Sequence, residues 1–174
     1  EVLAKKYTQA LLAYSTQAAD AAILVIEPGI PHNAQLLSRM RTVLLQSGFA
    51  PLSPCPHSMQ CPMNGTRGKK WCNFAFDTHD APRALQTLSQ RARVPKTRAV
   101  LSFMFMQKHT SAHMHTDTLS LRIASDAIRL PNGRIGFYAC TEYGLALAIK
   151  GTVPLHSGDM LTIQKPNITT AELD

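Results

Sequence analysis

Three cysteines lie close together in a segment that is rich in proline, glycine and basic side chains. Cys55, Cys61 and Cys72 stand within eighteen residues, in the strings Pro54–Met63 and Lys70–Phe74. Two of the three are followed directly by proline, which has no N–H and a fixed φ and therefore stiffens a loop beside a ligand. Because three thiols in such a loop make poor core material, the sequence predicts a metal-binding loop here rather than a buried helix or strand.

The spacing of the cysteines bears on the identity of the metal. Five residues separate the first pair and ten separate the second. Zinc sites usually place their ligands in tight pairs, with about two to four residues between them. The looser spacing is at least as compatible with a [4Fe–4S] cluster, which needs four ligands. Cys140, the remaining cysteine, could supply the fourth thiolate, although alone it is more simply a buried core thiol.

Two further residues near these motifs are candidates for ligand contact. His57 lies between the first two cysteines. It could ligate a metal or donate a hydrogen bond to a sulfur atom. We favour a His57 that is not itself a ligand and that contacts either the ligand residues or solvent. Glu27 ends an apolar run, where ligands of α/β sheets usually bind. It is therefore a candidate cofactor-binding residue, with capping of the next helix as the alternative.

The residues before the cysteines alternate between helical and strand patterns. A helical period covers residues 1–19, and Ala21–Ile26 is a short apolar run typical of a buried parallel strand. A second helix is predicted over Asn33–Gln46 and a second strand over Phe49–Leu52. This alternation predicts a parallel α/β sheet.

The later part of the chain has mainly β patterns. Ala99–Met106 predicts a buried strand, and Asn132-Gly133 between two apolar runs predicts a hairpin. Leu145–Ile149 and Met160–Ile163 predict two more strands, whereas helical phasing after the cysteines is confined to Pro82–Arg93. We therefore predict four regions: an α/β region (1–52), which the family resemblance given below makes part of a Rossmann-like fold, a cysteine-rich basic insertion (53–98), a return strand and loop (99–118) and a small β subdomain (119–174).

The positive charge of the chain is local. The chain carries 18 Lys and Arg against 11 Asp and Glu, a net charge of +7, and residues 66–98 alone contribute eight basic and two acidic side chains. Since Lys and Arg displace counterions from nucleic acid, this stretch predicts a phosphate-contacting surface, with a solvated loop as the alternative. The candidate RNA-binding residues are Arg67, Lys69, Lys70, Arg91, Arg93, Lys96 and Arg98.

Composition and missing motifs exclude several classes of protein. With 45% apolar and 17% charged residues, the chain is not generally disordered. Its apolar runs fall far short of the ~20 residues that cross a bilayer, so no membrane partner is expected. No glycine-rich nucleotide loop, serine nucleophile elbow or Cys/His catalytic arrangement is present. The chain opens at Glu1 without a methionine or a secretory leader, which suggests a fragment or a processed chain.

Several motifs, taken in order along the chain, resemble one protein family. They are Val25–Gly29, Pro54–His57 with Cys61-Pro62, Trp71–Phe74, Tyr138–Cys140 and Gly158-Asp159. This series is similar to the methyltransferase-like proteins of the small ribosomal subunit, a family that includes the mitochondrial small-subunit assembly factor and bacterial relatives. The resemblance covers roughly residues 20–160, and its most specific part is the string Cys-Pro-His…Cys-Pro…Trp-Cys-x-Phe.

The resemblance implies a fold and a cofactor. The fold is the C-terminal part of a class I, Rossmann-like methyltransferase sheet with a cysteine-rich metal-binding insertion and a small C-terminal antiparallel β extension. The implied cofactor is a [4Fe–4S] cluster on Cys55, Cys61, Cys72 and Cys140, with Zn²⁺ as the alternative. The family's N-terminal half, which carries the glycine-rich loop for the methyl donor, has no counterpart here. S-adenosylmethionine is therefore expected only if that half is present.

The function that the resemblance implies is that of an rRNA-binding, Fe–S-cluster-containing assembly factor of the small ribosomal subunit. Small-subunit rRNA and ribosomal proteins are the expected partners, and DNA is not expected. The alternative is an active S-adenosylmethionine-dependent rRNA methyltransferase that the missing N-terminal half completes, so enzymatic activity stays open. A zinc-ribbon-like nucleic-acid module is a third interpretation. The expected compartment is the mitochondrial matrix in a eukaryote and the cytoplasm in a bacterium.

Overall fold

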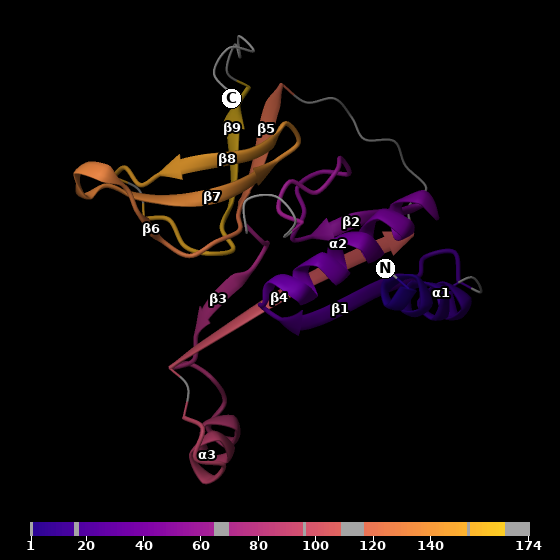
Figure 1. Ribbon diagram of the computed structural model, residues 1–174, viewed down its shortest axis with the longest axis horizontal. Coiled ribbons are helices and arrows are strands. Elements are labelled where there is room, and N and C mark those ends of the chain that lie inside the picture. Colours follow the sequence, from indigo (N-terminus) through magenta and orange to yellow (C-terminus); the bar gives the residue numbers. More distant parts are fainter. Residues whose placement is uncertain are drawn as a thin grey trace.

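The computed structural model describes residues 2–15, 18–64, 70–95, 97–108, 117–152 and 154–165. These residues form a mixed α/β structure with two antiparallel sheets (Figure 1). The elements of the first sheet and its helices are α1 (Val2–Ser15), β1 (Ala22–Pro28), α2 (Pro31–Gln46), β2 (Phe49–Ser53), β3 (Phe74–Asp77), α3 (Arg83–Arg91) and β4 (Arg98–Lys108). The second sheet contains β5 (Thr118–Ile123), β6 (Ile128–Arg129), β7 (Ile135–Thr141), β8 (Gly144–Ile149) and β9 (Met160–Gln164).

The long strand β4 organises the first sheet. β1, β2 and β3 all pair with β4 in the antiparallel direction, and the strand order is β1–β4–β2. Since β1 and β2 both run against β4, they run in the same direction as each other, and α2 connects them. The expectation of a parallel sheet is therefore wrong in its pairing, because β4 returns from later in the chain to lie between the two strands.

Two helices cover one face of this sheet. Leu37, Met40 and Leu44 of α2 are buried against Met104 and Met106 of β4, and α1 packs beside α2 (Figure 1). This cluster is the core of the first sheet, and α2 forms most of its cover.

The opposite face of β1 is open to solvent. Leu24 and Ile26 are 57% and 59% exposed, while Ile23 on the covered face is 5% exposed. The expectation of a strand buried on both faces is thus wrong. An apolar run identifies a strand but does not show that both of its faces are covered.

The second sheet has the order β6–β7–β5–β9, and β8 also pairs with β7. The predicted hairpin is confirmed, because β6 and β7 pair across a turn in which Asn132 and Gly133 have φ values of 64° and 72°. Asparagine and glycine tolerate this left-handed backbone better than other residues. Leu121, Ile123 and Phe137 form part of the core of this sheet.

The segment after the first two cysteines adds one strand that the sequence analysis did not predict. β3 has only four residues, and it is a strand because Phe74 to Asp77 pair with Leu101 to Arg98 of β4. α3 lies within Pro82–Arg93, where helical phasing was predicted.

No helix in the described ranges is both long enough and apolar enough to cross a membrane.

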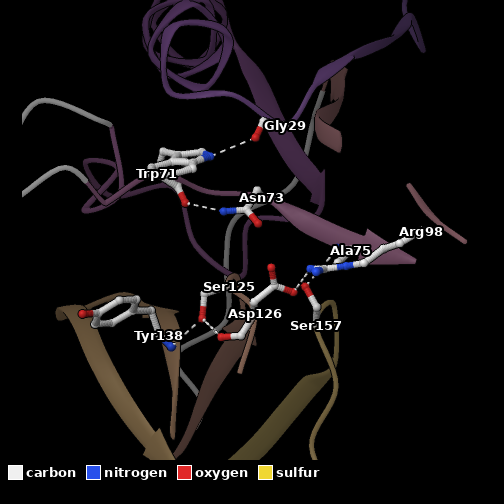
Figure 2. Close-up of polar contacts among 9 residues, drawn as sticks. All are labelled: Gly29, Trp71, Asn73, Ala75, Arg98, Ser125, Asp126, Tyr138 and Ser157. Atoms are coloured by element: carbon white, nitrogen blue, oxygen red, sulfur yellow. Dashed lines mark hydrogen bonds and ion pairs between the residues drawn. The ribbon is translucent and has the colours of Figure 1, made fainter. Parts of the chain in front are cut away.

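Residues 70–75 join the two sheets (Figure 2). The indole Nε1 of Trp71 donates to the carbonyl of Gly29 after β1, at 3.0 Å. The backbone N–H of Ala75 donates to Oγ of Ser157, which precedes β9, at 3.2 Å. An ion pair between Arg98 of β4 and Asp126, which follows β5, adds a third link (Figure 2). The cysteine segment is therefore held between the sheets rather than on the surface of one of them.

Candidate metal centre

The four cysteines come together between the two sheets. Cys55 and Cys61 lie in the loop after β2, Cys72 lies just before β3, and Cys140 is in β7. Cys61 and Cys72 pack against an apolar cluster that contains the buried Cys140. Cys55 lines the same hollow as Cys61 and Cys72. The structure thus brings the sequence-predicted cysteines into one group, although they come from three separate parts of the chain.

Side chains from both sheets fix the loop that carries these cysteines. Arg122 of β5 donates from Nε to the carbonyl of Pro54 at 2.8 Å and from Nη1 to the carbonyl of Gly158 at 2.6 Å. The carbonyl of Cys72 accepts a hydrogen bond from Oγ of Ser102, in β4, at 2.6 Å. The positions of the thiols are therefore set by the packing of β4 and β5 on the loop.

A buried arginine of α2 also faces the loop. Arg41 is 3% exposed, and it donates to the carbonyls of Met59 at 2.8 Å and His57 at 2.5 Å. Its positive charge also acts on the Cys55 thiol, where it opposes the rise in pKa that burial causes. None of the ion pairs among the described residues gives Arg41 a carboxylate partner. A buried charge is costly unless it is compensated, and the neighbouring thiols would compensate the charge of Arg41 only once they lose their protons.

The sequence analysis missed both arginines. Arg41 occupies a position on the same helical face as Leu37 and Leu44, where an apolar residue would be expected. A cation in the middle of an apolar helix face could therefore have indicated a buried, functional arginine. Arg122 lies on a short strand whose neighbours gave no comparable sign.

Burial controls the protonation of the cysteines. It raises the pKa of Cys72 well above the usual value, and neighbouring Cys55, Cys61 and Cys140 raise it further. Burial also raises the pKa of Cys55 and of Cys140, while the positive charge of Arg41 acts in the opposite direction on both. Without a metal these three groups are neutral thiols at pH 7. A metal would have to displace their protons, so binding would strengthen as the pH rises.

His57 is buried within the same group and contacts a sulfur atom, so of its two expected contacts only the one with solvent is contradicted. It is 7% exposed, and its Nε2 lies 3.2 Å from Sγ of Cys140. Burial, together with the positive charge of Arg41, lowers the pKa of His57 to about 4. The imidazole is therefore neutral at pH 7. Nδ1 of His57 and Nε of Arg41 are buried nitrogen atoms without a hydrogen-bond partner.

The shifted pKa of His57 predicts a pH-dependent stability of the metal-free protein. Its folded-state pKa of about 4 lies below the ordinary value of 6.5. Between these values the unfolded state binds a proton that the folded state does not, so the free energy of unfolding should fall as the pH falls. Above about pH 6.5 the contribution is complete. Urea unfolding with a chelator present, between about pH 7.5 and pH 4.5, measures this effect.

The control for this prediction separates His57 from the other titrating groups. The variant His57→Gln should show a shallower loss of stability over the same pH range. The exposed His79 offers a matched control, and His79→Gln should follow the unmodified protein. Equal pH dependence in His57→Gln and the unmodified protein would contradict the assignment.

The side chains fit a metal centre in their chemistry. Thiolates are soft anionic ligands, and Arg41 and Arg122 would offset part of their charge. As placed, no group of three or more His, Cys, Asp or Glu side chains in the described part of the chain is arranged to hold a metal ion. The hollow lined by Cys55, Cys61 and Cys72 measures about 30 Å³. It has room for one ion, and a four-iron cluster would require the thiols to spread.

One protein family matches most of this chain. Residues 2–132 match the family described as mitochondrial small ribosomal subunit Rsm22. The chain belongs to the Rsm22 family. The expected relationship to a family of the small ribosomal subunit is confirmed, and the matched region contains Cys55, Cys61 and Cys72. No curated protein matches the chain.

Glu27, the candidate cofactor-binding residue of this Rsm22-family chain, lies at the carboxyl end of β1. Its Oε2 accepts a hydrogen bond at 3.2 Å from Nδ2 of Asn33, in the first turn of α2. Asn33 also donates to the carbonyl of Pro28 at 3.4 Å. The carboxylate therefore supports the start of the helix, and its contact with a cofactor stays a prediction.

The candidate RNA-binding residues of the Rsm22-family chain lie in several places. Lys70 lies over the ring of Tyr138 in β7, with Nζ 4.4 Å from the ring centroid. Arg98 is in the ion pair that links the sheets. Arg91 and Arg93 are exposed at the end of α3. The remaining candidates lie outside the described residues, namely Arg67, Lys69 and Lys96.

Proposed function

We propose that this Rsm22-family chain is an rRNA-binding assembly factor of the small ribosomal subunit that holds a [4Fe–4S] cluster. The ligands would be Cys55, Cys61, Cys72 and Cys140. One observation carries the proposal: these cysteines gather between the two sheets, together with Arg41 and Arg122. The family of the chain is described as mitochondrial small ribosomal subunit Rsm22.

The proposed cluster would act as a structural element or as a sensor of iron–sulfur supply. Four cysteine ligands occupy all the protein-facing positions of a [4Fe–4S] cluster, which leaves none for substrate. The orphaned Nε of Arg41 is a donor that an inorganic sulfide could satisfy. Because the loop contacts α2, β4 and β5, binding energy at this site would stabilise the contact between the two sheets.

Zinc is the alternative occupant of the same site. One zinc ion needs four ligands at about 2.0–2.3 Å, and the small hollow between the thiols is closer to this requirement than to that of a cluster. The wide spacing of the ligands along the chain and the two neighbouring arginines favour the cluster. Metal analysis separates the two, and either metal would retain the four-cysteine site.

Contact with small-subunit rRNA is the second part of the proposal. Arg91 and Arg93 are exposed, and the stretch of 66–98 holds most of the positive charge of the chain. Such residues bind phosphates and make affinity depend on salt. The corresponding compartment is the mitochondrial matrix in a eukaryote, in line with the family description, or the cytoplasm in a bacterium.

An active rRNA methyltransferase is the second candidate function. β1, α2 and β2 form a unit in which two strands of the same direction are joined by a helix, and such units build Rossmann-like sheets. This supports the C-terminal part of a methyltransferase sheet. The chain contains no glycine-rich loop for S-adenosylmethionine, so methyl transfer would need a further half of the protein.

Co-sedimentation with the small subunit tests the proposed function. We expect Cys61→Ser to abolish association, because a lost cluster would release the loop that joins the sheets. Met59→Leu, an exposed change in the same loop, should associate normally. Circular dichroism of Cys61→Ser should retain the signal of α1 and α2, which shows that the first sheet is folded. Unchanged co-sedimentation of Cys61→Ser would sink the proposal.

A further inference from the structure

The β6–β7 hairpin and the adjacent end of β8 carry a group of basic side chains that the fold does not use. Arg129 of β6, Arg134 before β7 and Lys150 after β8 are all exposed. None of them forms an ion pair with another residue that the structure describes. Since exposed charges add little to stability even when they are paired, the three cations are not needed for the fold and are available to a ligand.

Backbone hydrogen bonds hold the three cations close together. Arg129 pairs with Ile135 across the hairpin, and the N–H of Lys150 donates to the carbonyl of Ile135 at 2.8 Å. The N–H of Leu130 donates to the carbonyl of Arg134, also at 2.8 Å. Neighbouring strands are ~4.8 Å apart, so the backbones of Arg129 and Lys150 lie ~10 Å apart, on either side of Ile135. The cations therefore belong to one end of the second sheet.

The tip of the hairpin presents these cations on both of its sides. Residues directly opposite each other in a sheet point to the same face, and successive residues of a strand point to opposite faces. Arg129, Ile135 and Lys150 therefore share one face, and Arg134 starts from the other. The turn between the strands is the 3₁₀ segment η1 (Pro131–Gly133). Figure 1 shows it at the left of the view, on the side of the second sheet that is away from α1.

The acidic residues on either side of these cations are already engaged. The sequence contains no acidic residue between Asp126 and Glu142 or between Glu142 and Asp159. Asp126 forms the ion pair that links the sheets, and Glu142 forms one with Lys165 at 3.3 Å. A carboxylate oxygen of Asp159 accepts a hydrogen bond from the N–H of His156 at 2.7 Å. The hairpin is thus locally positive, and its charge is complementary to an anionic ligand.

Phosphate groups fit this surface better than an acidic protein segment does. Exposed Arg and Lys side chains bind phosphate oxygens without a pocket, whereas the core of a protein interface is apolar and contains few lysines. On the face that carries Arg129 and Lys150, the residue between them is Ile135, which is only 36% exposed. Leu147 and Ile149 of β8 are also exposed, but their register with β7 places them on the opposite face.

We propose that the β6–β7 hairpin binds the sugar–phosphate backbone of RNA through Arg129, Arg134 and Lys150. The inference rests on the proposed contact with rRNA and adds a second surface to it, because none of these residues belongs to the stretch 66–98. Arg134 and Lys150 also lie beyond residues 2–132, the part that matches the family. Contacts with phosphates carry no information on base sequence, so binding here should depend on salt rather than on sequence.

Fluorescence anisotropy of the full chain with a labelled RNA stem-loop tests the proposal. The triple change Arg129→Gln, Arg134→Gln and Lys150→Gln should weaken binding at least ~10-fold at low salt. It should also reduce the slope of log Kd against log salt concentration by about 2–3, close to one for each lost phosphate contact. Arg129→Lys with Arg134→Lys keeps both charges and should keep the slope. The urea midpoint of the triple variant should not change, because the three side chains are exposed.

A second triple variant controls for the loss of net charge. Lys5→Gln, Lys6→Gln and Arg39→Gln remove three exposed cations of α1 and α2, and this variant should bind the RNA like the unmodified protein. Equal losses in the two triple variants would overturn the inference, as would an unchanged slope in the hairpin variant, and both results would leave the proposed function standing. An unmodified chain that did not bind the RNA would overturn the proposed contact with rRNA as well.

Ultraviolet cross-linking of the chain within small-subunit particles separates RNA from a protein partner. We expect nucleotide adducts on peptides that contain residues 128–136. Cross-links from these residues to a protein, without nucleotide adducts, would overturn the inference.

Discussion

Replacing Cys72 with serine is expected to remove the metal from the protein and to unfold the loop between β2 and β3. In a structural thiolate site the binding energy is folding energy, on the order of 10 kcal/mol for zinc in small domains. If the four cysteines were only core thiols, burying a hydroxyl in place of one would cost about 1–3 kcal/mol. The two interpretations therefore differ several-fold in their expected effect. Metal content per chain and hydrogen exchange of residues 54–63 and 70–77 measure the outcome.

A neighbouring residue provides the control for this prediction. Met63 is 1% exposed and packs in the same apolar cluster as the cysteines. Met63→Leu keeps an apolar side chain of similar volume and should retain the metal, with a cost below about 1.5 kcal/mol. A Cys72→Ser protein with the metal content and exchange protection of Met63→Leu would contradict the four-cysteine centre.

Replacing Arg41 with methionine is the second change with a large expected effect. Methionine keeps much of the volume but leaves the carbonyls of His57 and Met59 without their donor. Each unsatisfied buried group costs about 1–3 kcal/mol, and hydrogen bonds from a charged donor are the stronger ones. We therefore expect the free energy of unfolding to fall by about 3 kcal/mol. Denaturant unfolding of the metal-free protein measures it.

The same variant also tests the electrostatic role of Arg41. If its charge compensates the thiolates, Arg41→Met should bind metal more weakly as well as unfold more easily. Arg39, an exposed arginine of the same helix, supplies the matched variant Arg39→Met, which should change the free energy of unfolding by less than about 0.5 kcal/mol. Similar stability and metal affinity in the two variants would contradict the assigned role.

Local patterns predicted most elements of this fold. The helical period at residues 33–46 and the Asn132-Gly133 turn each depend on neighbours in the sequence, and the structure confirms both. Pairing could not be read in this way. Whether β1 contacts β2 or β4 depends on where residues some eighty positions later return, and β3 is a strand only because of that return.

In the candidate metal centre, too, the sequence predicted what depends on local composition but not what depends on tertiary contacts. The composition of the cysteine segment predicted that its thiols would gather, and the structure brings Cys140 to them from the second sheet. The burial of His57 and Arg41 was not predicted, because it depends on the contact between the two sheets. The spread of the basic residues is a further consequence of tertiary structure, since Lys70 and Arg98 are engaged in contacts with the second sheet.

The metal content of the protein tests the central proposal most directly. Anaerobic purification, followed by iron, sulfide and zinc analysis and a visible spectrum, should give about four irons and four sulfides per chain and a broad band at about 400 nm. One zinc and no iron would contradict the cluster while retaining the four-cysteine site. A folded protein with neither metal would contradict the metal centre itself.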